Sequence, residues 1–542
     1  MIFKFIKRYF YTIIKLNFSQ ILYRVKKNIF PQSYKIIRHQ KFVKQIDKPI
    51  FHGISKINQN KILTLPNKFL FLNKEDEVHS FIDNSNEKLW RYNLYYFNYL
   101  SQSKTNKDYK SKSIQLINMW IEEIEKGEPL EPYPTSLRIV NWIKWSLHEQ
   151  YYDEQFISSL YSQAAYLKKN IEYDILGNHL IANSKALIFS GIYFYRSEGK
   201  KFLDKGKYIL FKNIDKQILE DGGHYERSPM YHSIVLEDLL DIYYLAYNQK
   251  ELFKSNEIDK LGFKISKMLS WLVFMTHSDG KISFFNDSAL KISSSLEELL
   301  LYAKEMNIRP ALKSENIFLK ESGYYVFSKN NINLKYNLGS PGPNEQPGHS
   351  HADTLSFEFS LGGHRIIVNS GTSTYEKNSL RAKQRSTSFH STLEIENTNS
   401  SDVWSAFRLG RSAKVNNISY YTKKNVTKVV ASHDGYYDLD KIIHTRDIEI
   451  HERKLVISDT LNLFKNNSKI RFFLSPFVLV DTSPLRIKTP DGSIIRVISD
   501  EKNMIIKDSK WYPEFGKEVS NKCIEILMHD KESLTIFEWD KI

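Results

Sequence analysis

The sequence predicts an α+β chain in which a helical domain precedes an antiparallel β-domain. Apolar residues recur with helical spacing between about residues 75 and 305, and with a period of two after about residue 320. A run of helices followed by a run of strands is typical of proteins whose helices and sheets occupy separate layers or domains. We therefore expect three parts: a basic amphipathic segment at residues 1–70, a helical domain at 71–320, and a β-domain at 321–542.

The N-terminal segment mixes apolar and basic residues. Lysine and arginine interrupt every apolar run in residues 1–30 well before the roughly 20 residues that a membrane-spanning helix needs. The segment also lacks the apolar core and cleavage site of a signal peptide. Two interpretations stay open, an amphipathic helix in peripheral contact with an anionic membrane or one packed on the chain's own helical domain. The compartment, cytoplasm or periplasm, stays undetermined.

The helical domain is predicted from apolar stripes. Ile117, Trp120, Ile121 and Ile124 fall on one helix face, and residues 236–243 repeat that spacing. Residues 180–194 are apolar nearly all round, which indicates a buried helix. Turn chemistry breaks the pattern at Gly127-Glu128-Pro129, Pro132-Tyr133-Pro134, Asp221-Gly222-Gly223 and Asp279-Gly280. Short breaks between long helices favour antiparallel pairs, in a bundle or in an α/α toroid.

The β-domain is predicted from alternation and hairpin turns. Apolar and polar residues alternate over 355–361, and Gly362-Gly363 then turns the chain into 365–368. Asp491-Gly492 separates two further strand-like runs in the same way. Residues 339–348, rich in glycine and proline, read as a long loop that delivers His349 and His351.

Composition narrows the range of partners. The formal net charge of +15 favours an anionic partner. The chain has no zinc-finger or RNA-binding signature and no block of five basic residues, so nucleic acid is not favoured. The single cysteine, Cys523, excludes an internal disulfide and cysteine-type zinc sites.

Two clusters of reactive side chains belong to the helical domain. Asn178 and His179 open the buried helix, where they either cap it or grip a carboxylate at its positive end. The second cluster, residues 221–232, is either a solvated loop before a helix that starts near Ser228-Pro229, or a catalytic segment. A cation such as Arg227 would lower the pKa of Tyr231 and make it a candidate general base or acid.

The third cluster is Gly348-His349-Ser350-His351-Ala352-Asp353 in the β-domain. Alternate residues of an extended segment point to the same side, so the two histidines suit a metal site or proton transfer. The other interpretation is a pair of exposed loop histidines. Asn369 and His390 could complete a three-ligand zinc site with His351, although asparagine is a weak zinc ligand.

Taken in order, these segments resemble the heparinase II/III family of polysaccharide lyases, including members encoded with bacterial surface-polysaccharide genes. The resemblance rests on residues 90–97, 134–142, 177–180, 221–232, 348–353, 369–372, 384–390 and 403–408. It implies an incomplete α/α toroid packed on an antiparallel β-sandwich, with a cleft between them. It also implies β-elimination on an acidic polysaccharide that contains uronate.

The resemblance also assigns roles to residues. Asn178 would neutralise the uronate carboxylate together with His179. Tyr231 would be the acid and a candidate base, and His349 its partner from the β-domain. The predicted substrate-binding residues are Arg138, Arg227, His224, Glu226 and Trp404.

The chain departs from the family pattern in its metal site. The family's zinc-binding aspartate corresponds here to Asn369, and Ser391 follows His390 where the family usually has asparagine. Lyase chemistry requires no cofactor, so a structural zinc is an optional addition. Two other functions stay open, a non-catalytic glycan-binding protein of polysaccharide assembly or export, and a glycoside hydrolase that uses Glu226 or Asp353.

Overall fold

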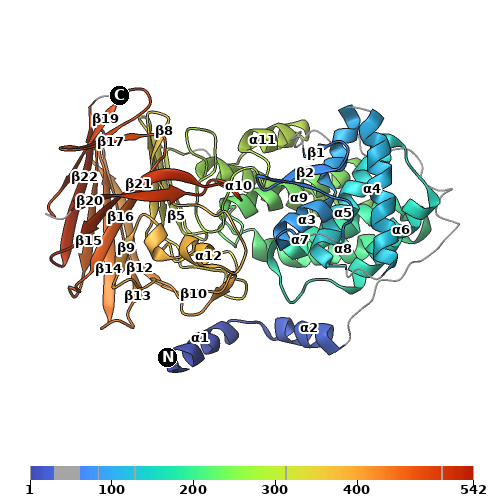
Figure 1. Cartoon of the computed structure of the whole chain (residues 1–542), viewed down its shortest axis with the longest axis horizontal. Coiled ribbons are helices and arrows are strands. Elements are labelled where there is room, and N and C mark those ends of the chain that lie inside the picture. The colour runs from blue at the N-terminus through green and yellow to red at the C-terminus, as the bar shows by residue number, and fades with distance from the viewer. Residues whose placement is uncertain are drawn as a thin grey trace.

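The computed structural model describes residues 2–29, 62–82, 85–105, 107–126, 130–311, 314–501 and 504–540. The predicted turn Gly127-Glu128-Pro129 and the N-terminal segment between residues 30 and 61 lie outside the described residues. Helices fill one half of the molecule and strands the other, with the chain passing from the first to the second (Figure 1). This order confirms the predicted α+β class.

The helical half holds the predicted apolar stripes. Its helices are α3 (Lys88–Tyr96), α4 (Lys107–Glu125), α5 (Pro132–Glu149), α6 (Glu154–Lys169), α7 (Gly177–Tyr193), α8 (Lys200–Gln217), α9 (Pro229–Asn248), α10 (Ser255–Phe274) and α11 (Leu296–Glu305), with short turns η1 (Asn98–Thr105), η2 (Tyr195–Gly199) and η3 (Lys250–Leu252). The α4 stripe is buried, and so is nearly every residue of α7. Helix α7 packs against α5, α8 and α9, so it is central, as its all-round apolar sequence predicted.

The predicted break at Pro132-Tyr133-Pro134 is wrong, because α5 begins at Pro132. Proline fits the first turn of a helix, where its missing N–H would have had no partner and its fixed φ already suits the helix. A small sheet of β1 (Leu63–Thr64), β2 (Lys68–Phe71) and β3 (Lys74–Glu77) precedes the helices. Phe71 packs edge-on against Trp90 of α3, which joins this sheet to the helical core.

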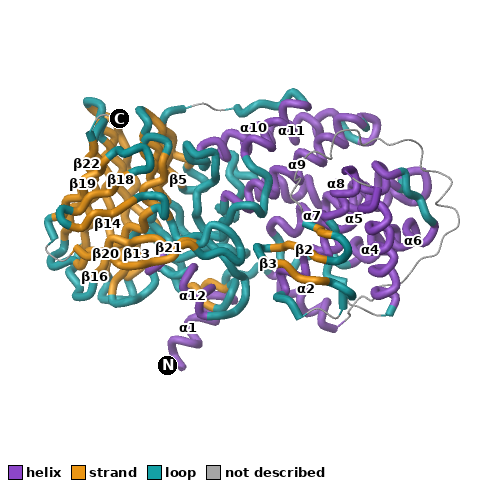
Figure 2. Tube along the Cα trace, turned by 45° about the horizontal axis from the view of Figure 1, so that its top comes forward, coloured by secondary structure: helices purple, strands orange, loops and turns teal. Residues whose placement is uncertain are grey.

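The β-half is two antiparallel sheets packed face to face (Figure 2). One sheet holds β4 (Asn316–Leu319), β5 (Tyr324–Lys329), β6 (Ile332–Asn337), β7 (Phe357–Leu361), β8 (His364–Val368), β9 (Leu393–Ile395), β16 (Ser468–Leu474), β20 (Met504–Trp511) and β21 (Val519–Leu527). The other holds β12 (Val415–Lys423), β13 (Val426–Tyr436), β14 (Ile442–Ile450), β15 (Lys454–Leu461), β17 (Leu479–Thr482), β18 (Leu485–Lys488), β19 (Ile494–Ser499) and β22 (Glu532–Trp539). The connecting loops hold a short strand pair, β10 (Val403–Trp404) and β11 (Arg408–Leu409). They also hold two short helices, α12 (Ser379–Gln384) and η4 (Thr387–Phe389).

Both predicted hairpins are present, β7–β8 around Gly362-Gly363 and β18–β19 around Asp491-Gly492. The alternation on β7 does not put its polar face in water, however, because every residue of that strand is buried. The segment between α10 and α11 covers this face. Glu358 of β7 accepts a hydrogen bond from the backbone N–H of Phe284 and pairs with the imidazole of His277 at 2.9 Å.

Aromatic contacts also cross the seam between the halves. Phe284 packs edge-on against Trp511 of β20 at 5.3 Å between ring centroids. Phe515, from the loop between β20 and β21, belongs to the apolar core of the helical half. The two halves therefore exchange side chains at the seam.

The N-terminal segment forms two helices, α1 (Ile2–Ile13) and α2 (Phe18–Ile29), which lie along one edge of the molecule (Figure 1). None of the described helices has both the length and the apolar character needed to cross a membrane. Cys523 is buried in β21.

Candidate active site

A cleft of about 1200 Å³ opens between the two halves. The helical half lines it with Asn178 and His179 of α7 and Tyr231 of α9. The β-half contributes His349, from the long loop before β7, and Tyr375, from the loop after β8. The four residues predicted to be catalytic therefore border one cavity.

The N-terminus of α7 is held by side chains from the segment 221–232. Glu226 Oε1 accepts a hydrogen bond from the backbone N–H of Asn178 at 2.9 Å, and Tyr225 Oη accepts one from Gly177 at 3.0 Å. A carboxylate at a helix N-terminus also meets the positive end of the helix dipole. Gly177 has φ +60°, and a Cβ there would lie 2.2 Å from Glu226 Oε1, so this contact requires glycine.

The side chain of Asn178 does not cap its own helix, since Glu226 already fills that role. Asn178 is almost fully buried, and its Oδ1 has no hydrogen-bond partner among the described residues. A buried amide oxygen without a partner carries a desolvation cost that a substrate group could relieve.

His179 is positioned to carry a positive charge. Its ring stacks on Tyr133 at 4.3 Å, and its Nδ1 lies 3.1 Å from Glu172 Oε1. Burial alone would lower the pKa of His179, but the carboxylates of Glu172 and Glu226 outweigh it and hold the pKa above the ordinary value. An imidazolium beside the Asn178 amide gives this wall of the cleft an anion-binding character.

Tyr231 is a neutral phenol in this site. Burial, followed by the neighbouring Tyr375 and Asp287, raises its pKa well above the ordinary value. Its hydroxyl lies 3.1 Å from that of Tyr375, and its ring stacks on His349 with centroids 3.8 Å apart. Helix α9 starts at Pro229, and the Ser228 hydroxyl accepts from the Tyr231 N–H, as the predicted helix start implied.

His349 is oriented by Asp287, in the segment between α10 and α11. The Nδ1 of His349 lies 2.9 Å from Asp287 Oδ2, and the Asp287 backbone N–H donates to the His349 carbonyl at 3.0 Å. A carboxylate only accepts, so Nδ1 donates to Asp287, and Nε2 is the ring nitrogen outside that pair. Nε2 lies 3.6 Å from Glu226 Oε2, beyond hydrogen-bonding distance, so it stays available as a base.

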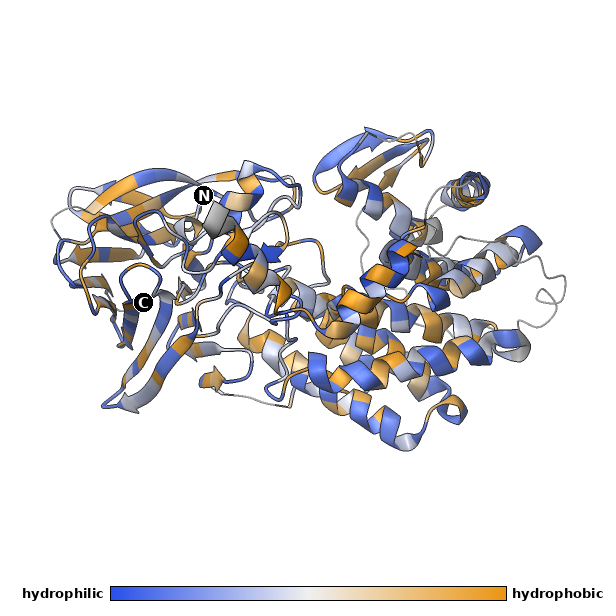
Figure 3. Ribbon diagram, turned by 90° about the horizontal axis from the view of Figure 1, so that it is seen from below, coloured by the Kyte–Doolittle hydropathy of each residue, from blue (hydrophilic) through white to orange (hydrophobic). Residues whose placement is uncertain are grey.

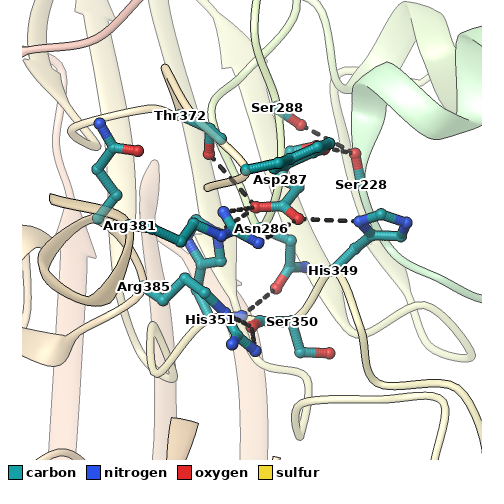
Figure 4. Close-up of polar contacts among 12 residues, drawn as sticks. Ser228, Asn286, Asp287, Ser288, His349, Ser350, His351, Thr372, Arg381 and Arg385 are labelled. Atoms are coloured by element: carbon teal, nitrogen blue, oxygen red, sulfur yellow. Dashed lines mark hydrogen bonds and ion pairs between the residues drawn. The ribbon is translucent and has the colours of Figure 1, made fainter. Parts of the chain in front are cut away.

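Asp287 is the hub of a buried polar network (Figure 4). It also meets His351 Nε2 at 2.8 Å and the Arg381 guanidinium, whose Nη2 donates to Oδ2 at 2.7 Å. Burial would raise the pKa of Asp287, but Arg381 and the two histidines hold it well below the ordinary value. The carboxylate is therefore ionised although it is fully buried.

His351 and His390 bind each other. Nδ1 of His351 lies 3.1 Å from Nε2 of His390, whose Nδ1 donates to the Ser386 carbonyl at 2.7 Å. Asn369 lies elsewhere, with its amide between Ser356 and Ser391. Burial lowers the pKa of His351 to about 4 and of His390 to about 3.

Within the described ranges no three histidine, cysteine or acidic side chains form a metal-binding group. His351 Nδ1 and His390 Nε2 face each other at 3.1 Å, while the amide of Asn369 is engaged with two serines. A structural zinc stays an untested prediction.

Two predicted substrate-binding arginines are bound to other parts of the protein. Arg138 is buried on α5, where it donates to Gln163 at 2.7 Å and stacks over Trp120. Arg227 donates to the Ser340 and Glu321 carbonyls, so it holds loops of the seam. Neither lines the cleft, and the predicted lowering of the Tyr231 pKa by Arg227 is wrong because burial dominates there.

Three other predicted substrate contacts are also corrected. His224 is fully buried against Gln217, and burial lowers its pKa well below the ordinary value. Glu226 lies beneath the cleft, where it holds α7. Trp404 is covered by α1, with its ring 4.9 Å from that of Tyr9, so it does not face the cleft.

Sequence reasoning missed Asp287 and Tyr375. Asp287 stands in Asn286-Asp287-Ser288, a run typical of an ordinary turn, and its partners are far away in sequence. Tyr375 follows the motif at 369–372 by three residues, and no pattern in the sequence distinguishes it as a functional residue. The only available signal was the polar run Asn286-Asp287-Ser288 directly after two buried phenylalanines.

A set of charged residues further along the helices was also missed. Two turns beyond Asn178 and Tyr231, Lys185 of α7 pairs with Asp238 of α9 at 2.8 Å and with Asp241. Lys144 of α5 joins Asp241 at 2.7 Å. Lys144, Lys185, Glu237 and Asp238 line the cleft, so its inner end carries both signs of charge.

Together these groups can remove a proton next to a carboxylate. An amide and an imidazolium can bind the carboxylate, an imidazole held by a buried carboxylate can accept a proton, and a neutral phenol can donate one. All of them border the same cleft.

Comparison with known proteins shows matches along most of the chain. Residues 97–311 match the family model described as heparinase II/III N-terminus, and residues 312–540 match the one described as heparinase II/III-like, C-terminal. The chain is 24% identical over 383 residues to a heparin-sulfate lyase of Pedobacter heparinus, covering 65% of this chain and 53% of that protein. A heparin-sulfate lyase of Bacteroides thetaiotaomicron is 25% identical over 281 residues, 45% of this chain and 40% of that protein. The chain therefore aligns with about half of the length of the curated relatives.

Solved structures share the fold. A crystal structure of heparinase III superposes with a TM-score of 0.69 at 16% identity, covering 96% of this chain and 89% of the other. A heparan sulfate lyase from Pedobacter heparinus gives a TM-score of 0.57 at 17% identity, covering 96% and 87%. These similarities confirm the predicted incomplete α/α toroid followed by an antiparallel β-sandwich.

The buried Asp287 network predicts a large stability effect. Asp287→Asn should lower the free energy of unfolding by about 3–5 kcal/mol, because it leaves the Arg381 charge buried without its partner. Chemical denaturation measures this loss. The matched control is Asp438→Asn, which removes the exposed ion pair with Lys7 and a longer pair with Arg411 and should cost about 1 kcal/mol or less. Equal effects of the two substitutions would contradict the role of Asp287.

Proposed function

The chain belongs to the heparinase II/III family, and from this we propose that it is a polysaccharide lyase that cleaves a uronate-containing acidic polysaccharide by β-elimination. One observation carries the proposal. Tyr231 stacks on His349, whose Nδ1 is held by Asp287, in the same cleft as Asn178 and the charged His179. The relatives are named as heparin-sulfate lyases, which supports a glycosaminoglycan-like substrate.

The first task is to make the proton at C5 of the uronate acidic. A free carboxylate resists this, because removing the proton adds negative charge next to an existing one. Asn178 and His179 would bind the carboxylate and spread that charge. The amide NH2 of Asn178 can donate to a carboxylate oxygen in the cleft, and the raised pKa of His179 favours the imidazolium beside it, which supports these two roles.

The second task is proton transfer. His349 Nε2 would take the C5 proton. The electron pair of the broken C5–H bond would form the C4–C5 double bond as the C4–O bond breaks. Tyr231 would give its hydroxyl proton to the leaving oxygen, and Tyr375, 3.1 Å away, would pass a proton to the resulting phenolate. The high pKa of Tyr231 favours the acid over the base role, because the free enzyme holds the phenol.

The observations do not favour the hydrolase alternative. Hydrolysis needs two carboxyl groups facing the scissile bond. Glu226 and Asp353, the predicted pair, are both buried and do not line the cleft. A glycan-binding protein without activity would not need the oriented His349 and the neutral Tyr231 together.

We also propose the division into residues 1–70, 71–320 and 321–542. The boundary at residue 70 falls within β2, whose Phe69 and Phe71 both pack in the helical core, so the sheet β1–β3 would extend the helical domain towards the N-terminus. The proposed partner is an acidic polysaccharide, including bacterial capsule, whereas the predicted peripheral membrane contact concerns a different surface, that of α1 and α2.

Tyr231→Phe tests the acid role. It should lower kcat by about 10²- to 10⁴-fold, because the leaving oxygen loses its proton donor, while substrate binding stays nearly unchanged. Acidic polysaccharides, including the host's own capsule, are screened for near-ultraviolet absorbance of an unsaturated uronate. The matched control is Tyr247→Phe, an exposed residue of the same helix. Full activity of Tyr231→Phe would contradict the role, and a product without the double bond would contradict a lyase.

His349→Gln tests the base role. It should lower kcat by about 10²- to 10⁴-fold with little loss of thermal stability, because Asp287 keeps Arg381 and His351 as partners. His364→Gln, at the partly exposed start of β8, is the control and should leave kcat unchanged. A variant that unfolds, or one that turns over normally, would refute a catalytic His349.

His179 predicts a pH dependence of substrate binding. Its pKa is raised, so the positive charge is present below the ordinary value of 6.5, persists above it, and is lost as the pH rises through the shifted pKa. KM should therefore rise as the pH rises above 6.5 and through the shifted pKa, a range in which uronate stays ionised. At the lower pH His179→Gln should raise KM about 10- to 100-fold and flatten the profile. An unchanged profile in that variant would assign the titration to another group.

A further inference from the structure

Helices α1 and α2 expose their apolar face to solvent, whereas a surface helix usually buries it. In α1 the exposed apolar residues of this face are Ile6, Phe10 and Ile13, followed by Ile14 just beyond the helix, whereas Tyr9 packs on Trp404. In α2 they are Phe18, Ile21, Leu22, Val25 and Ile29. Both sets follow helical spacing, so each helix has a continuous apolar stripe that faces away from the protein. Phe10 is 59% exposed and Phe18 is 78% exposed.

The opposite, polar face holds the helices to the body. Arg8 forms two hydrogen bonds to Asp402 Oδ1 and one to Oδ2, at 2.6–3.1 Å, and Lys15 donates to the Gly410 carbonyl at 2.6 Å. In α2, Gln20 donates to the Glu345 carbonyl at 3.0 Å. These directional contacts and the Tyr9–Trp404 packing fix which face points outward.

The same pair crosses the seam and forms part of the cleft. Figure 3 views the molecule from the side on which α1 and α2 lie, and the two helices run from the sheets towards the helical half. Helix α1 contacts β11. Arg24 of α2 donates to the Asp174 carbonyl in the loop before α7. Thr12, Leu16, Gln20 and Arg24 line the cleft on the inner side of the pair.

An exposed apolar stripe of this length marks an interaction site. Residues 1–29 contain seven lysines and arginines and no acidic residue. Such a helix, with large apolar residues on one face and cations at its margins, suits the interface of an anionic bilayer. A second copy of the chain fits less well, because two segments that are both positively charged repel each other.

We propose that α1 and α2 dock the protein on an anionic lipid bilayer, with the apolar stripe in the headgroup region and Lys26 and Lys27 near the lipid charges. Both lysines are exposed at the end of α2. Docking would hold the mouth of the cleft at the membrane surface, because the inner face of the pair lines that cleft. This binding goes beyond the lyase chemistry and does not depend on it.

The test is co-sedimentation of the full chain with vesicles of phosphatidylcholine, with or without phosphatidylglycerol. The wild type should bind the anionic vesicles, bind phosphatidylcholine alone far more weakly, and lose binding at high salt. The double variant Phe10→Ser/Phe18→Ser should bind about 100-fold more weakly, with an unchanged thermal unfolding profile. Phe477→Ser is the matched control, since Phe477 is 64% exposed on the β-half and should leave binding unchanged.

Three results would overturn the proposal. One is wild-type protein that stays in solution with anionic vesicles, and another is a double variant that sediments like the wild type. The third is a dimer in light scattering that the double variant dissociates, because the stripe would then be an interface between copies of the chain. None of these measurements uses the polysaccharide, so failure here leaves the lyase proposal untouched.

Discussion

The structure depends on one buried charge, the carboxylate of Asp287. An ionised carboxylate without water is very costly unless partners surround it, and Asp287 meets Arg381, His349 and His351. Its position between α10 and α11 and the position of these partners in the β-half make the network a bridge across the seam. The electrostatic requirement of one residue thus fixes how the two halves meet.

The same network also positions side chains that line the cleft. His349 can present Nε2 only because Asp287 holds Nδ1, and Tyr231 keeps its place against the His349 ring. On the other wall, Glu226 fixes the start of α7 and leaves the Asn178 side chain free to face a substrate. Buried groups therefore position each side chain at the cleft before any substrate arrives, as electrostatic catalysis requires.

The N-terminal helices obey a different constraint. Their contacts with the body are polar, and the face that a surface helix usually buries is turned outward. One interpretation of this segment from the sequence was an amphipathic helix packed on the chain's own helical domain. The contacts of Arg8, Gln20 and Arg24 do hold it to both halves, and the outward stripe leaves room for a second neighbour.

The sequence by itself determined the helical and strand periods, the buried helix α7, the hairpins and the segments that border the cleft, because these depend on local spacing and turn chemistry. Only the tertiary structure decided which polar residues are accessible. Arg138 and His224 carry suitable groups but are buried, Arg227 is bound to loop carbonyls at the seam, and Trp404 is covered by α1. Asp287 and Tyr375 gain their roles from partners more than 60 residues away. Burial and long-range pairing leave no periodic trace in a sequence.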